Sequence, residues 1–191
     1  KSFIMKKIIV SLFVAAFAFS ANAQIKTPAP SPSQKIEQMV GLTDVTLEYS
    51  RPSMKGRKIF GDLQDYGKVW RTGANKNTTL TFSTDFMVGG KTLKAGTYAL
   101  FTIPGEKTWD VILYSDASNW GTPGKWDDTK VAAKITVTPE VMTMPVETFT
   151  ITFDNLTNNS AVVGILWENT YVGLKFETPT DAMVSKQITA V

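Results

Sequence analysis

The stretch TLTFSTDFMVGGKTLKAGTYALFTI, residues 79–103, decides the fold of this chain. In its first half, apolar side chains at Leu80, Phe82, Phe86 and Val88 alternate with threonine, serine and aspartate. Because successive side chains of a strand point to opposite faces, this period of two predicts strands with one buried and one solvated face.

Glycine and proline mark the turns of this stretch. Gly89 and Gly90 predict a tight turn that closes a hairpin between Phe86 and Leu93, since glycine tolerates the backbone angles of two-residue turns. The segment PGEKT, residues 104–108, predicts a second turn, which leads from YALFTI into WDVILY. The stretch therefore predicts consecutive antiparallel strands.

The same alternation recurs along the rest of the chain. VTLEY, ETFTITFD and YVGLKFE alternate in the same way, whereas WDVILY and AVVGILW are apolar on both faces and are expected to be central strands. Turn signals recur roughly every ten residues, as in sandwiches and barrels. We expect an all-β fold, an antiparallel two-sheet β-sandwich of a jelly-roll-like kind with about nine or ten strands. The one helical turn expected is in FGDLQDYG, residues 60–67.

The N-terminus predicts an export signal. Lys6 and Lys7 precede a mostly apolar run of twelve residues, 8–19, and an Ala-x-Ala site ends at Ala23. These three features are typical of a secretory signal peptide, and the run is too short for a hydrocarbon core that needs about 20 residues. We therefore expect residues 1–23 to be a signal peptide cleaved after Ala23. The protein would then be periplasmic or secreted, with no transmembrane segment in the mature chain.

The remaining sequence divides into two parts. QIKTPAPSPSQ, residues 24–34, is rich in proline and serine and predicts a flexible arm. Residues 35–191 are expected to form a single β-sandwich domain, since their length suits one hydrophobic core.

Two residue types are missing from the sequence, and their absence excludes whole classes of chemistry. The chain contains no cysteine and no histidine. Disulfides, thiolate metal sites, histidine zinc sites and Ser-His-Asp catalysis are therefore excluded. We expect no cofactor and no metal. The segment DASNWGTPGKWDD offers oxygen ligands suited to Ca²⁺, but it lacks the regular spacing of an EF-hand loop.

The net charge argues against nucleic acid as a partner. The whole chain has a formal charge of +3, from 20 basic and 17 acidic residues. Cleavage after Ala23 would remove three of the basic residues and no acidic one, so the mature chain would be formally neutral. Nucleic-acid-binding proteins usually need a basic surface. What remains is a local excess of positive charge between Arg51 and Lys76.

All three arginines of the chain, Arg51, Arg57 and Arg71, lie in that basic segment. A guanidinium group offers a planar fork of donors that matches a carboxylate, a phosphate or a sulfate, and Asn75 adds an amide. One hypothesis is therefore a pocket for a polar or anionic ligand built from these four residues. The alternative is structural: the guanidinium groups hold irregular loops by donating to backbone carbonyl oxygens and nearby carboxylates. The sequence leaves both open.

The segment SDASNWGTPGKWDDTK carries Trp120 and Trp126 in a polar, glycine- and proline-rich context. These two rings are expected either to form an aromatic wall of the binding site, since flat rings stack on sugar faces and cations, or to anchor the long loop to the sandwich. The other three tryptophans lie in strand-like runs and are expected in the core: Trp70, Trp109 and Trp167.

Four pieces of the sequence resemble a family of exported proteins of Gram-negative bacteria, domain-of-unknown-function family number 2911. They are YSRPSMKGRKIFG, YGKVWRTGANKNTTLTFSTD, LKAGTYALFTIPG and TWDVIL, and the similarity extends from about Lys35 onward. The resemblance implies secretion and a β-rich fold, but no activity, ligand or catalytic residue. Some relatives continue into a helical C-terminal extension. Because this chain stops at Val191, soon after its last predicted strand, we expect the β domain alone.

Three functions are compatible with these patterns. The leading hypothesis is an exported, non-catalytic binding module for a polar or anionic ligand: a saccharide, a peptide carboxylate or a phosphate. The first alternative is a carboxylate-based hydrolase of an envelope glycan, which needs two suitably spaced acidic side chains. The second is an envelope assembly protein that docks another envelope protein.

Overall fold

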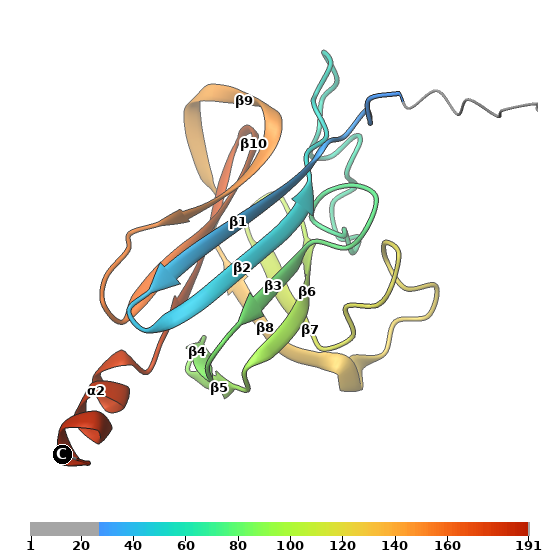
Figure 1. Cartoon of the computed structure of the whole chain (residues 1–191). Helices are drawn as coiled ribbons and strands as arrows, with labels where there is room; N and C mark the ends of the chain where they lie inside the picture. The colour runs from blue at the N-terminus through green and yellow to red at the C-terminus, as the bar shows by residue number, and fades with distance from the viewer. Residues whose placement is uncertain (1–26, 191) are drawn as a thin grey trace, which may run out of the picture.

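The computed structural model describes residues 27–190, and over this range it has ten β-strands in two antiparallel sheets, with a short helix at the C-terminal end (Figure 1). The predicted two-sheet β-sandwich is confirmed. The predicted signal peptide lies outside the described residues. Within the described part, no helix is long and apolar enough to cross a membrane.

The larger sheet has the strand order β1-β2-β3-β6-β7-β8 and the smaller sheet the order β5-β4-β10-β9. The larger sheet contains β1 Ser33–Val40, β2 Thr43–Ser50, β3 Thr79–Phe82, β6 Gly96–Ile103, β7 Trp109–Tyr114 and β8 Val131–Val137. The smaller sheet contains β4 Phe86–Val88, β5 Lys91–Leu93, β9 Glu140–Asp154 and β10 Ser160–Glu177. The helices are the 3₁₀ turn η1, Asp128–Lys130, and α2, Thr180–Thr189.

Residues 79–103 join the two layers. β3 lies in the larger sheet, the β4–β5 hairpin in the smaller one, and β6 returns to pair with β3. The hairpin has the predicted register, Phe86 opposite Leu93, and its turn residues Gly89 and Gly90 have positive φ angles of 56° and 77°. Where the chain crosses between layers, the rings of Phe82 and Phe86 stack with centroids 3.6 Å apart. One short segment therefore pins both sheets together.

The core between the sheets contains the three tryptophans that the alternation assigned to it, and that prediction is confirmed. Trp70 and Trp167 stack at a centroid distance of 5.8 Å, and Phe149 meets both rings edge-on, at 5.2 and 5.5 Å. Phe60 adds edge contacts to Trp70, Trp109 and Trp167. We call these five rings the aromatic cluster. It fills the sandwich beneath the irregular chain between β2 and β3.

Three details differ from the sequence-based expectations. AVVGILW and YVGLKFE form one strand, β10, which is interrupted by pairing irregularities on either side of Glu168, a residue with a φ of +54°. FGDLQDYG makes hydrogen-bonded turns and a bridge between Phe60 and Gln64 instead of a helical turn. The chain after β10 forms the short helix α2, which the sequence patterns did not predict.

The aromatic cluster generates a stability prediction. Phe149 is fully buried, so Phe149→Ala should lower the free energy of unfolding by about 3–5 kcal/mol through lost burial and the cavity left behind. Val141 is 89% exposed in the neighbouring part of β9, and Val141→Ala should change stability by less than about 0.5 kcal/mol. Denaturant unfolding of both variants would measure this. Equal stabilities would contradict the role given to the cluster.

Candidate functional site

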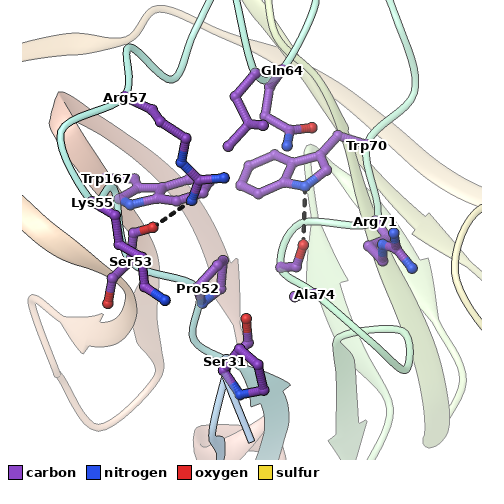
Figure 2. A pocket seen from close by; sticks show the side chains of 13 residues that line it. Ser31, Pro52, Ser53, Lys55, Arg57, Gln64, Trp70, Arg71, Ala74 and Trp167 are labelled. Atoms are coloured by element: carbon purple, nitrogen blue, oxygen red, sulfur yellow. Dashed lines mark hydrogen bonds between the residues drawn. The ribbon is translucent and has the colours of Figure 1, made fainter.

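A cleft of about 340 Å³ opens above the aromatic cluster, at the end of the sandwich opposite α2 (Figures 1 and 2). Thirteen residues line it, and they come from three parts of the chain. The N-terminal arm contributes Pro30 and Ser31, β10 contributes Trp167, and the chain between β2 and β3 contributes the rest. We call this the arginine cleft.

The loop that carries Trp70 and Arg71 has a fixed path. Trp70 and Thr102 of β6 exchange two backbone hydrogen bonds, of 2.7 and 2.9 Å. The next turn holds Thr72 at a φ of +52°, a strained value for a β-branched residue. Thr72 is buried, and its hydroxyl group donates to Thr102 Oγ1 (3.1 Å), while Thr78 Oγ1 donates to the Thr72 carbonyl oxygen (2.5 Å). Surrounding hydrogen bonds therefore enforce the strained conformation.

Gly73 lets this loop close over the core. A Cβ atom at this position would lie 2.9 Å from Thr78 Oγ1 and 3.1 Å from the Ser50 carbonyl oxygen, and its φ of +147° disfavours other residues. The Gly73 carbonyl oxygen accepts a hydrogen bond of 3.1 Å from the indole Nε1 of Trp70, which Figure 2 shows at the centre of the cleft. The N–H donor of the buried indole thereby has a hydrogen-bond acceptor, and the ring is held in one orientation.

The side chains lining the arginine cleft carry one sign of charge. Lys55, Arg57 and Arg71 are cationic, and none of the 13 lining residues is acidic. The carboxylate of Glu147 accepts from the Lys55 backbone N–H (2.8 Å), but Glu147 does not line the cleft. The electrostatic field of such a lining attracts anions and repels cations.

Arg51 is placed apart from this cleft and acts as a structural link. Its Nε donates to the Phe149 carbonyl oxygen (3.0 Å) and its Nη2 to Thr150 Oγ1 (2.7 Å), so it ties the end of β2 to β9. Its backbone N–H donates to the Pro32 carbonyl oxygen (2.9 Å). Of the two readings of the arginines, the structural one describes Arg51.

Arg57 and Arg71 fit both hypotheses, because each residue holds its own loop and also lines the cleft. Arg57 donates from Nε to the Met54 carbonyl oxygen (2.8 Å) and from Nη2 to that of Ser53 (2.7 Å), as Figure 2 shows in part. Arg71 donates from Nη1 to the Asn75 carbonyl oxygen (3.0 Å). Both residues line the cleft, and these bonds use only part of the five N–H donors of each guanidinium.

Asn75 does not line the cleft but holds one of its walls. Its Nδ2 donates to the Ser31 carbonyl oxygen (3.2 Å) and to Ser50 Oγ (3.3 Å). Asn75 has a φ of +60°, a conformation that asparagine tolerates better than most residues. The amide thus attaches the arm, and with it Ser31, to the edge of the site.

Neither Trp120 nor Trp126 lines the arginine cleft. Trp126 packs on the outer face of the larger sheet, with its ring 5.4 Å from Phe101 and 4.7 Å from Tyr114, and its Nε1 donates to Asp128 Oδ1 (3.0 Å). It anchors the loop, as the structural alternative for the tryptophans expected. Trp120 is 70% exposed.

We call residues 115–130, which carry Trp120 and Trp126, the tryptophan loop. Asp116 fixes the start of this loop. Its carboxylate accepts from Lys130 Nζ (2.7 Å), from Ser118 Oγ (2.6 Å) and from the Ser118 backbone N–H (3.1 Å). These bonds, the one from Lys130 foremost, hold the pKa of Asp116 well below its usual range. The contribution of this anchor to stability is present above the ordinary aspartate pKa of 3.8 and is lost as pH falls through the lower folded-state value.

Sequence reasoning missed Lys55, Trp167 and the arm as parts of the site. Lys55 lies in the same basic segment as the arginines, so its neighbourhood could have suggested it. Trp167 and Pro30 are far from that segment in sequence and reach the cleft only through the packing of β10 and the arm, for which no local signal exists. Among the described residues, no group of three or more acidic side chains could hold a metal ion.

The bonds of Arg51 predict a structural phenotype. Arg51→Ala removes two hydrogen bonds from a charged, partly buried donor and should lower the free energy of unfolding by about 1–3 kcal/mol. Arg51→Lys keeps the charge but cannot supply the fork, so it should recover only part of the loss. Denaturant unfolding would measure both. Wild-type stability of Arg51→Ala would contradict the assignment.

Comparisons with known proteins place most of the domain in one family. A search of curated proteins and a search of solved structures each find no significant match. The family model described as protein of unknown function (DUF2911) matches residues 31–176, which include all ten strands except the last residue of β10, and every cleft residue except Pro30. This match covers well over half of the chain, and the chain therefore belongs to the DUF2911 family.

Proposed function

We propose that this protein is an exported, non-catalytic binding module whose arginine cleft takes a small anionic group. The observation that carries the proposal is the charge of the cleft: three cationic side chains and no acidic one among its 13 lining residues. Candidate groups are a carboxylate, a sulfate or a phosphate, all of which match the guanidinium fork.

The local charge contrasts with the rest of the molecule. A mature chain without residues 1–23 would be formally neutral. The excess of positive charge at the cleft is therefore local and does not reflect the net charge of the protein. A concave surface lined by one sign of charge raises the local concentration of the opposite ion and speeds its arrival. This distribution suits a small anion better than a long polyanion such as nucleic acid.

The fixed geometry of the loop supports binding by a preformed site. Hydrogen bonds hold Trp70, Thr72 and Gly73, and the guanidinium groups of Arg57 and Arg71 are each tied to backbone carbonyl oxygens. Binding then costs little ordering of side chains, which is the main way a small site gains affinity.

The hydrolase alternative finds less support. A carboxylate-based glycosidase needs two acidic side chains at the scissile bond, and the 13 lining residues include none. Asp110 and Asp116, on the other hand, form ion pairs with Lys134 and Lys130, at 2.8 and 2.7 Å. The assembly alternative rests on no particular surface.

Export itself rests on the N-terminal sequence, which predicts a signal peptide.

Lys55 gives the cleanest test, because among the described residues its Nζ has no hydrogen-bond or ion-pair partner to lose. Lys55→Gln should leave the melting temperature unchanged and weaken binding of the best anion by roughly tenfold, about 1.4 kcal/mol for one charge-assisted contact. The panel is inorganic phosphate, sulfate, D-galacturonate and free-carboxylate dipeptides, measured by calorimetry.

Lys58→Gln is the matched control for this measurement. Lys58 is an exposed lysine in the same loop and does not line the cleft, so the same charge change there should alter affinity less than about twofold. If both variants lost the same affinity for the anion, the effect would come from the overall charge of the loop and not from a contact in the cleft. The absence of any anion binding to the wild type would overturn the proposal.

A further inference from the structure

We infer that Trp120 forms a second subsite beside the arginine cleft and that the ligand is an acidic oligosaccharide, with its anionic group in the cleft and an adjoining sugar ring stacked on Trp120. This inference rests on the proposed function and specifies its ligand. It is carried by the contact between the tryptophan loop and Arg71, and by the exposure of Trp120.

The tryptophan loop meets Arg71, a residue that lines the cleft, at Gly121. This glycine is buried, has a φ of +85° and lies directly on the Arg71 guanidinium. A Cβ atom there would lie only 2.7 Å from Arg71 Nη1 and 3.4 Å from Cζ, so the close approach requires a residue without a side chain. Because Trp120 directly precedes Gly121, its backbone lies close to Arg71, which lines the cleft.

Within residues 27–190, the Trp120 side chain makes no hydrogen bond and no aromatic contact that would hold its own loop. Trp126 packs against Phe101 and Tyr114, and Asp116 fixes the other end through Lys130. The four other tryptophans are buried or half-buried, whereas Trp120 is 70% exposed. An indole ring with open faces on an anchored loop is therefore available for a ligand, and it loses little freedom on binding.

The size of the cleft requires any longer ligand to continue outside it. A volume of about 340 Å³ is near the lower end of the ~300–1,000 Å³ typical of small-molecule sites. Its own indole rings, Trp70 and Trp167, are only 5% and 1% exposed, so they offer no open face for stacking. An anion held by Arg71 places the next unit of the ligand beside Trp120.

The surroundings of Trp120 favour a sugar over an apolar group. Its sequence neighbours are Ser118, Asn119, Gly121 and Thr122, none of which carries an apolar side chain as large as leucine. A sugar matches this environment, because its C–H face stacks on the indole while its hydroxyl groups remain hydrogen-bonded to polar neighbours and water.

The test compares D-galacturonate with α-1,4-linked trigalacturonate in calorimetry on the whole mature chain. In the wild type, the trimer should bind about tenfold more tightly than the monomer, the scale of one stacking contact. Trp120→Ala should remove this gain and leave monomer affinity unchanged, and Trp120→Phe should restore part of it. The matched control is Ile188→Ala, which removes an equally exposed (72%) apolar side chain on α2, away from the site.

Further measurements distinguish a failure of this inference from a failure of the proposed function. Lys55→Gln should weaken monomer and trimer alike, and the trimer should protect Trp120 from iodide quenching in the wild type. Equal monomer and trimer affinities, or a trimer gain that survives Trp120→Ala, would overturn the subsite while leaving anion binding intact. Binding of phosphate or of free-carboxylate tripeptides without binding of galacturonates would overturn the ligand class. If no probe binds, the proposed function fails as well.

Discussion

Trp70 is the constraint on which the rest of this site depends. Its backbone pairs with Thr102 of the larger sheet, while its ring packs on Trp167 and Phe149 of the smaller one. Its indole N–H must find an acceptor once it is buried, and the Gly73 carbonyl oxygen provides it. A loop that is attached to both layers through one residue can follow few other paths. The strained turn that follows is the result of this attachment.

The same constraint removes the apparent conflict between a structural and a functional role for the arginines. Arg51 does not line the cleft, and its guanidinium group joins the end of β2 to β9. Arg57 and Arg71 each bond the carbonyl oxygens of their own loop and still present donors to the cleft. The bonds that stabilise the loop also fix the direction of the charges. A guanidinium held in this way binds an anion without first losing its own freedom.

The sequence predicted the strands well where one face is buried, because alternation at positions such as Leu80 and Phe82 reflects burial directly. It failed where structure depends on a distant partner. The polar residues around Glu168 resemble a turn, yet pairing with β9 carries the strand through them as a bulge. Likewise, Lys55, Arg71 and Trp167 meet only after β10 has docked, so the basic segment could be suspected but its cleft could not be outlined.

The crossing of residues 79–103 between the layers also limits the order in which the two sheets can fold. β4 pairs with β10 through Val88 and Phe176, whereas most neighbouring strands of the larger sheet are close in sequence. Sheets dominated by distant pairings form slowly, since the entropy of closing the intervening chain must be met first. During synthesis, β4 can pair only with β5 in its own sheet until residue 176 has emerged to pair with Val88. The larger sheet can form early as a half-open layer, and the sandwich closes only when nearly the whole chain is present.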